Sequence, residues 1–182
     1  MLSDIIDYDL RLLFVGINPD PQSYEMGMPY IGRSNHFWPC FHSSGLLDKR
    51  VGPRQIGDLL NIHRIGFTNI CARPTVRASE LSVREKQRGA VALRCLIEEY
   101  RLSVVCFLGV EAYTVFAGTT RFRLGLQEEV ITRWSNALGG ACLAYVMPST
   151  SARVVAYQLS DKKEFFRELA TYVIAQQQLR QN

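Results

Sequence analysis

Apolar residues gather in short runs along the chain, and three of these runs are almost continuous. They span residues 11–17, 103–108 and 141–147. Apolar runs of this length without polar alternation are typical of strands that are covered on both faces, as in a parallel sheet. Shorter extended segments are predicted over residues 66–71 and around residues 129–132.

The segments between these runs show helical spacing and helix-capping residues. Ser82 and Glu85 form a capping box, which predicts a helix that begins there and reaches Tyr100. Asp161, with Glu164 at the fourth position, predicts the start of a terminal helix that runs to about residue 178. Further helices are expected over residues 36–41 (closed by Gly45), 53–61 and 110–117.

Strands and helices therefore alternate along the chain. With right-handed crossovers, this alternation predicts an α/β fold: a three-layer α/β/α sandwich around a short, mainly parallel sheet. No internal repeat, linker or low-complexity segment interrupts residues 1–182, so we expect a single domain. Residues 18–35 are expected to form a long loop, and long loops inside small domains are often functional.

The first apolar run ends abruptly in Gly16-Ile17-Asn18-Pro19. Ligands of parallel α/β sheets bind outside the carboxyl ends of the strands, so this loop is the expected floor of a site. Gly16 allows a close approach of the backbone, and Pro19 keeps Asn18 outside a helix. Taken alone, the same residues also fit a simple strand-to-loop turn with Asn18 as a turn residue.

A second segment, residues 145–153, repeats the arrangement of apolar strand, proline and small polar loop, and it ends at Arg153. Further motifs lie between the two segments: Gly27-Met28-Pro29-Tyr30-Ile31-Gly32-Arg33-Ser34-Asn35-His36-Phe37-Trp38, Gly66-Phe67-Thr68-Asn69 and Arg73-Pro74-Thr75. Together these motifs resemble the mismatch-directed uracil/thymine-DNA glycosylases of the uracil-DNA glycosylase superfamily. The resemblance extends from Arg11 into the final helix.

The resemblance implies an enzyme that flips a base out of duplex DNA and hydrolyses its N-glycosidic bond, the first step of base excision repair. It implies that Asn18 positions the attacking water, and that backbone amides near Ile17 and Tyr30 face the pyrimidine carbonyls. A neutral Asn cannot take a proton as a carboxylate can. Catalysis is therefore expected to depend on stabilising the leaving base, and to be slow.

The resemblance also assigns a base pocket that includes Gly16 and Ile17. Tyr30 would stack on the flipped base, although a tyrosine packed in the core is an alternative. Asn69 would pair with the edge of the base, because an amide both donates and accepts; capping of the strand end is its alternative role. Bacterial mismatch enzymes have a lysine at the position of Asn69, so this position favours the thymine-directed branch.

The loop after the last apolar run would enter the minor groove of DNA. By resemblance it consists of Ser149, Thr150, Ser151, Ala152 and Arg153. Its other residues are small, so Arg153 would fill the gap that the flipped base leaves and would contact the orphan guanine. A phosphate contact, or a salt bridge with Asp161, is the alternative for Arg153.

Two residues depart from the family pattern. Asp20 stands where the family usually has glycine, and Ser23 stands where the thymine branch has alanine. Both are expected to narrow the pocket near C5 of the pyrimidine, which would favour uracil over thymine. A rival interpretation is that the Asp20 carboxylate activates the water in place of the neutral Asn18.

Composition adds modest constraints. The chain has 182 residues and a net charge of +4. It contains 17 Arg and 4 Lys, and this excess of Arg suits phosphate binding but is equally well explained by genome composition. Its five cysteines form no metal-binding pattern, and burial as free thiols is expected. We expect no cofactor or metal, no membrane association, a monomer, and an intracellular location in the cytoplasm, nucleoid or nucleus.

Three functions remain open at this level. The favoured one is a monofunctional glycosylase that removes uracil opposite guanine in double-stranded DNA with G·U or G·T mismatches, with thymine left open as a second substrate. No lysine stands in either motif loop, so no Schiff-base step is expected. The second is a mismatch-binding module with vestigial catalysis. The third, a nucleotide hydrolase unrelated to DNA, is disfavoured because a Gly-rich phosphate loop is missing.

Overall fold

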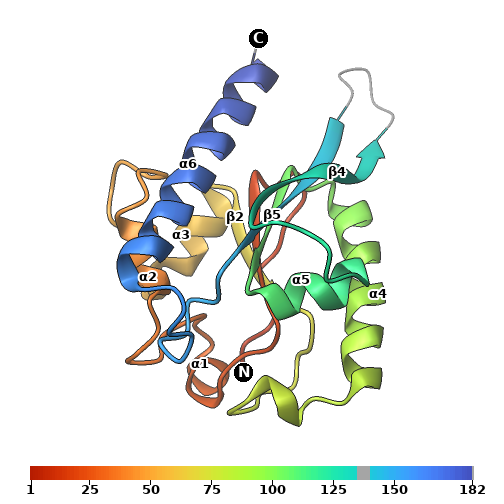
Figure 1. Ribbon diagram of the computed structural model, residues 1–182. Coiled ribbons are helices and arrows are strands. Elements are labelled where there is room, and N and C mark those ends of the chain that lie inside the picture. The colour runs from red at the N-terminus through yellow and green to blue at the C-terminus, as the bar shows by residue number, and fades with distance from the viewer. Residues whose placement is uncertain (135–139, 182) are drawn as a thin grey trace.

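The computed structural model describes residues 1–134 and 140–181, and its strands form one five-stranded sheet. The strands are β1 (Leu12–Gly16), β2 (Ile65–Asn69), β3 (Val104–Leu108), β4 (Gly125–Trp134) and β5 (Gly140–Met147). Their order across the sheet is β2-β1-β3-β5-β4 (Figure 1). The first four of these are mutually parallel, and only β4 runs antiparallel to its neighbour β5. The mainly parallel sheet expected from the sequence is confirmed.

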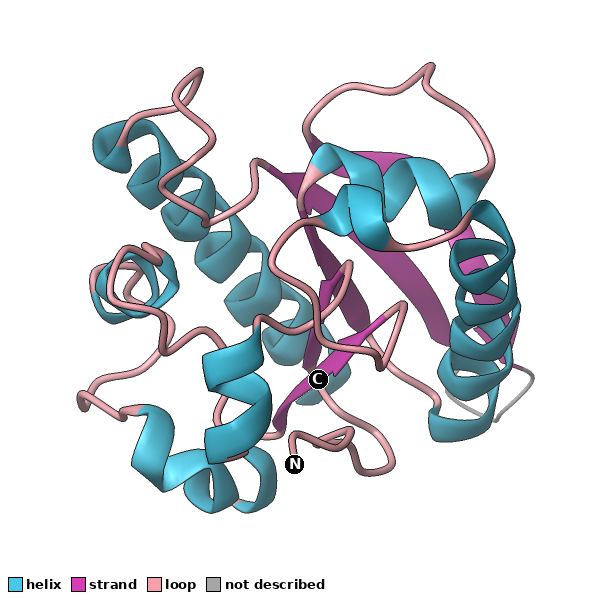
Figure 2. Ribbon diagram, turned by 90° about the horizontal axis from the view of Figure 1, so that it is seen from below, coloured by secondary structure: helices cyan, strands magenta, loops and turns pink. Residues whose placement is uncertain are grey.

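Helices cover both faces of this sheet (Figure 2). On one side lie α2 (Phe37–His42), α3 (Ile56–Asn61) and α6 (Leu159–Gln181). On the other side lie α4 (Val83–Tyr100) and α5 (Val110–Ala117). The result is the predicted three-layer α/β/α sandwich.

The central strand β1 explains why the run of apolar residues is continuous. Leu12 and Phe14 face the core beneath α2 and α6, whereas Leu13 and Val15 face the core beneath α4 and α5. All four side chains are fully buried, so both faces of the strand are apolar. The Phe14 ring packs edge-on against Phe37 at a centroid distance of 5.0 Å, and this contact fixes the start of α2 near the end of β1.

A short helix, α1 (Pro21–Met26), occupies part of the segment that was expected to be a loop. Asp20 is its N-cap and accepts a hydrogen bond from the backbone N–H of Ser23, while Pro21 stands in the first turn. Gly27 ends the helix with a left-handed backbone at φ 65°. An N-cap, a proline and a glycine are ordinary helix signals, but six residues are too few to show helical periodicity.

The other predicted elements are close to those observed. Helix α4 has the predicted bounds and capping box. Helix α6 begins at Leu159, so Asp161 lies in its first turn and accepts from the backbone N–H of Gln158 at 2.7 Å. Helix α2 ends at His42, before the predicted closing residue Gly45. A 3₁₀ turn at Pro53–Gln55 precedes α3 and completes the predicted second helix.

Segments outside the main elements add detail. Ile5 pairs with Phe67 through two backbone hydrogen bonds of 2.8 Å, so the N-terminal lead-in covers the outer edge of β2.

All five cysteines are free; four are buried as expected, but Cys95 is exposed. Within the described residues, no helix is long and apolar enough to cross a membrane.

Candidate active site

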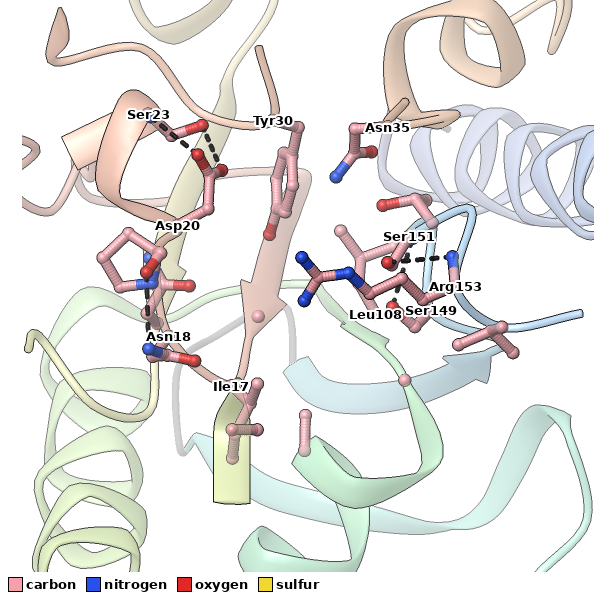
Figure 3. A pocket seen from close by; sticks show the side chains of 18 of the residues that line it. Ile17, Asn18, Asp20, Ser23, Tyr30, Asn35, Leu108, Ser149, Ser151 and Arg153 are labelled. Atoms are coloured by element: carbon pink, nitrogen blue, oxygen red, sulfur yellow. Dashed lines mark hydrogen bonds between the residues drawn. The ribbon is translucent and has the colours of Figure 1, made fainter. Parts of the chain in front are cut away.

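A cavity of about 780 Å³ opens at the carboxyl ends of β1, β2, β3 and β5 (Figure 3). The sheet register brings these ends level, with Gly16 opposite Asn69 and Leu108 opposite Met147. The cavity is lined by most of the residues predicted to form the site: Gly16, Ile17, Asn18, Asp20, Ser23, Tyr30, Asn69, Ser149, Thr150, Ser151 and Arg153. Ala152 belongs to the same loop but does not line the cavity.

Asn18 is held in one orientation by its side-chain nitrogen. Nδ2 donates to Thr75 Oγ1 at 2.7 Å, to the backbone oxygen of Arg73 at 3.0 Å and to that of Pro19 at 3.3 Å. These bonds use only the N–H groups, so Oδ1 is left to accept a hydrogen bond from a water molecule. The side chain therefore both anchors a distant loop and presents a fixed acceptor at the cavity.

The loop that Asn18 anchors is itself tied to helix α4. The Arg73 guanidinium bonds the Glu85 carboxylate through Nε at 2.7 Å and Nη2 at 3.1 Å. Arg73, followed by the capping contacts with Ser82, lowers the pKa of Glu85 to about 2. Thr75 Oγ1, which accepts from Asn18, donates in turn to the backbone oxygen of Arg77 at 2.8 Å. The predicted catalytic residue is thus supported by a loop with several fixed contacts.

Asp20 and Ser23 are bound to each other. Asp20 Oδ1 accepts from the Ser23 backbone N–H at 3.0 Å, and Oδ2 accepts from the Ser23 hydroxyl at 2.6 Å. Ser23 Oγ also accepts from the backbone N–H of Ile31 at 3.2 Å. Both residues line the cavity as expected, but their polar atoms stabilise the start of α1 and its contact with the following loop. This capping role was not foreseen.

Tyr30 has an unusual backbone and a buried hydroxyl. Its φ is 58°, a left-handed conformation that non-glycine residues rarely adopt. Its ring stacks on Phe37 with centroids 4.6 Å apart and an interplanar angle of 22°. The hydroxyl has no hydrogen-bond partner among the described residues, and burial raises the pKa of Tyr30. Leaving a buried hydroxyl unpaired costs about 1–3 kcal/mol in general.

Gly16 lies beneath Tyr30 and Asn69. A Cβ atom at this position would lie 2.6 Å from Asn69 Oδ1 and 2.9 Å from the Tyr30 hydroxyl. Both distances are shorter than real Cβ contacts, so a larger residue would displace the two side chains. Glycine is required here because two polar groups converge over its backbone.

The loop of residues 148–154 is docked mainly through its backbone. The His36 N–H donates to the Thr150 carbonyl at 2.8 Å, and the Ala152 N–H donates to the Ser34 carbonyl at 3.2 Å. The Thr150 side chain is only 2% exposed. Thr150 is therefore almost entirely enclosed by the protein where it lines the cavity, and its contact with DNA stays a prediction.

Arg153 is the exposed end of this loop. Figure 3 shows its guanidinium reaching into the cavity from the wall opposite Asp20. Nη1 donates to the backbone oxygen of Val76 at 2.8 Å, which links the loop to the segment anchored by Asn18. The predicted alternative, a salt bridge with Asp161, is not formed; the Asp161 carboxylate accepts from the Gln158 backbone instead.

Lys162 supports the same loop from below. It is 1% exposed, and Nζ donates to the Ser151 carbonyl at 2.9 Å and to the Val154 carbonyl at 3.4 Å. His36 Nδ1 lies 3.4 Å from the same Nζ. Burial lowers the pKa of Lys162, and burial together with the Lys162 charge lowers the pKa of His36. A neutral His36 can accept a hydrogen bond from the ammonium.

The chain matches a known family. The model of the uracil DNA glycosylase superfamily matches residues 3–173. The chain belongs to the uracil DNA glycosylase superfamily. A similar solved structure is the solution NMR structure of a candidate uracil DNA glycosylase from Methanosarcina acetivorans. The two sequences are 19% identical, and the match covers 92% of this chain and 96% of the other. The TM-score is 0.52, so the similarity concerns the fold.

Membership of the superfamily implies a hydrolase that acts on DNA. The described residues suit such chemistry: one wall offers a fixed acceptor on Asn18, the floor offers Asn69 and Tyr30, and the far wall offers a cation on Arg153. Within the described residues, no group of three or more His, Cys, Asp or Glu side chains is arranged to hold a metal ion.

Sequence reasoning did not assign a role to three residues of this site. Thr75 belongs to a motif that supports the resemblance, but its bond to Asn18 spans 57 positions and no local pattern indicates it. Asn35 belongs to the motif of residues 27–38, and its Oδ1 accepts from the Phe37 N–H at 2.9 Å. Its amide nevertheless also lines the cavity. Lys162 lies in the first turn of a helix, where a lysine is ordinarily solvated.

Proposed function

We propose that this protein is a monofunctional, mismatch-directed DNA glycosylase that excises uracil, and more weakly thymine, opposite guanine. The observation that carries the proposal is the orientation of Asn18. Three hydrogen bonds fix its Nδ2, which leaves Oδ1 as an acceptor at the cavity formed by the strand ends. The proposed substrate is double-stranded DNA with a G·U or G·T mismatch, bound by one copy of the chain.

The proposed reaction is hydrolysis of the bond between C1′ of the deoxyribose and N1 of the base. The bonding electrons leave with the base, and the sugar becomes cationic as the bond breaks. A water molecule held by Asn18 Oδ1 adds its oxygen to C1′ and loses a proton to solvent. The base then takes up a proton and departs. Because Asn18 is neutral, stabilisation of the anionic base carries most of the catalysis.

Arg153 is proposed to act on the DNA rather than on the bond that breaks. Its side chain is exposed at the cavity rim, and its only hydrogen bond among the described side-chain contacts is to Val76 O. A side chain of this length can enter the stack when the base has left, and its guanidinium matches the edge of the orphan guanine. DNA binding would then replace the bond to Val76.

Asp20 and Ser23 are proposed to narrow the pocket on the C5 side of the pyrimidine. Their mutual hydrogen bonds hold both groups in place at the cavity wall. A thymine methyl group beside a carboxylate would displace water without offering a hydrogen bond in return. Discrimination by one methyl group is usually limited to about 1–3 kcal/mol, so weak activity on G·T is expected to remain.

The direct test uses a panel of duplexes that contain G·U, A·U or G·T pairs or inosine, together with single-stranded uracil DNA. Single-turnover release of free base, scored as abasic sites, is expected to be fastest from G·U. Release from A·U as fast as from G·U would remove the mismatch specificity and leave a general uracil glycosylase. No release from any substrate would refute the glycosylase.

Asn18 is neutral, and the Asp20 carboxylate is engaged as the N-cap of α1. Both observations also fit a mismatch-binding module with vestigial catalysis. The same panel separates the two functions. A binding module retains G·U duplexes in preference to matched DNA but leaves the base attached after prolonged single-turnover incubation. Size-exclusion chromatography of the free protein and of its complex tests the proposed monomer.

A further inference from the structure

The hydroxyl of Tyr30 is a buried polar group that nothing in the described protein satisfies. Buried hydroxyls nearly always have a hydrogen-bond partner. A buried hydroxyl that has none and lies at a cavity therefore indicates a group that forms its hydrogen bond with a bound ligand. Figure 3 shows the ring entering from the upper wall with its oxygen directed into the cavity. The expected role of Tyr30, stacking on the flipped base, does not use this oxygen.

The surroundings of the ring argue against stacking as its main role. One face of Tyr30 is already covered by Phe37, whose ring lies nearly parallel at 4.6 Å. Phe67 lies near its ring as well, tilted at 6.4 Å. The left-handed backbone of Tyr30 then turns the end of the ring, rather than a free face, toward the floor of the cavity. Strained backbone of this kind persists where the surrounding structure holds it, often at functional sites.

The hydroxyl converges with a second polar group. The Tyr30 oxygen and Asn69 Oδ1 lie within 2.9 Å and 2.6 Å of one point above Gly16. A hydroxyl can donate, and an amide oxygen accepts, so the pair presents a donor beside an acceptor. A base that carries a carbonyl next to a ring N–H is complementary to this pair. Uracil, thymine and hypoxanthine have such an edge, whereas cytosine has an amino group in place of the carbonyl.

We propose that the Tyr30 hydroxyl donates a hydrogen bond to a carbonyl oxygen of the flipped base and stabilises the negative charge that develops there as the glycosidic bond breaks. This inference rests on the proposed glycosylase function. It assigns a substrate class, bases with a carbonyl beside a ring N–H. It also makes Tyr30 a catalytic residue through its oxygen rather than its ring. Burial keeps the hydroxyl protonated, as a donor must be, because it raises the pKa of Tyr30.

The test is Tyr30→Phe, which removes one oxygen and keeps the ring that packs on Phe37. Single-turnover excision from a G·U duplex at saturating enzyme is expected to slow by about 100-fold, the lower end of the effect of losing one such donor. Duplex affinity is expected to be unchanged. The melting temperature of the free protein is expected to stay the same or rise, because the variant removes a buried hydroxyl that has no partner there. Tyr113→Phe is the matched control, because Tyr113 packs on Phe107 and Phe116 away from the cavity.

Thymine distinguishes a hydrogen bond from a steric role. Uracil and thymine carry the same carbonyl groups, so Tyr30→Phe should slow their release from G·U and G·T duplexes by the same factor. A hydroxyl that merely excludes the C5 methyl group predicts the opposite, faster release of thymine. That result, or a uracil rate within about twofold of the wild type, would overturn the inference.

Binding of free uracil tests the hydroxyl separately from activity. Uracil is titrated into the full chain, wild type or Tyr30→Phe, and followed by NMR of ¹³C-labelled tyrosine and of the backbone amides. Tighter binding by the wild type supports the inference even if the wild type releases no base, in which case only the proposed reaction fails. Equal affinity of the two proteins, or no binding by either, contradicts the hydrogen bond.

Discussion

Two loops face each other across the cavity, and they are held in different ways. The first, from residues 18 to 31 with residues 73–77, is fixed by side chains of its own: Asn18 bonds Thr75, and Asp20 bonds Ser23. The second, residues 148–154, contributes backbone groups that are held from outside by His36, Ser34 and the buried Lys162. A hydrogen bond from the Arg153 side chain to Val76 O joins them.

The difference separates two tasks of a base-excising enzyme. In the proposed mechanism the first loop holds a water molecule and a base in place, and its internal hydrogen bonds would provide that rigidity before DNA binds. In the proposed mechanism the second loop enters the DNA and adjusts to its shape. The exposed side chain of Arg153 has a single hydrogen bond to the described residues, the one to Val76 O, and DNA could replace it. Substitutions in the first loop should therefore alter the chemical step, and those in the second should alter DNA binding.

Asn18→Ala is expected to have the largest effect, a fall in the single-turnover rate of about 10²–10³-fold or more with duplex affinity largely intact. Thr75→Ala is the matched control, because it removes the partner of Nδ2 but leaves the Asn18 oxygen. It should cost less activity than Asn18→Ala. Retention of most of the rate in Asn18→Ala would show that the residue only anchors the loop.

Arg153→Ala should act on binding instead. The loss of a contact with the orphan guanine is expected to weaken affinity for product duplex by about 1–3 kcal/mol, with reduced preference for guanine opposite the abasic site. Arg153→Lys keeps the charge but not the planar guanidinium. It should therefore retain the salt dependence of DNA affinity and lose the preference for guanine opposite the abasic site. If Arg153→Ala alters only salt-dependent, sequence-independent affinity, the side chain is a phosphate contact.

Asp20→Gly tests selectivity within the first loop. Thymine release from G·T is expected to rise by about tenfold while uracil release is unchanged, within the usual limit for one methyl group. Replacement of an N-cap by glycine costs only a few tenths of a kcal/mol, and Asp20→Ser keeps a capping oxygen without the charge. Ser23→Ala should act in the same direction. Loss of uracil release in both Asp20→Gly and Asp20→Asn would instead make Asp20 the general base.

Lys162→Met is expected to have the smallest effect on catalysis. It removes the Lys162 donor from the Val154 carbonyl and leaves the Ser151 carbonyl with only the Val154 N–H, but it also removes a buried cation, so a net loss of about 1 kcal/mol is expected. For a chain of this size that corresponds to a melting temperature about 2–4 °C lower. Product-duplex affinity should fall several-fold, while excision at saturating enzyme changes less. A larger effect on the rate than on affinity would contradict the division between the two loops.

The sequence by itself determined most of the architecture. The continuous apolar run of β1 indicated a strand covered on both faces, and Leu12 to Val15 are buried on alternate sides. Ser82 and Glu85 marked the start of α4, and the segment 110–117 is a helix with the predicted bounds. These features are local, because periodicity and caps depend on residues a few positions apart.

The tertiary structure alone decided how the site works. The bond from Asn18 to Thr75, the contact of Arg153 with Val76 and the burial of Lys162 all join segments that local patterns do not relate. They arise because the parallel register brings the ends of β1 and β2 together and because α6 docks beneath the second loop. Tyr30 shows the same limit. Its ring was predictable as part of the site, but only the packing of Phe37 and the backbone at φ 58° direct its hydroxyl into the cavity.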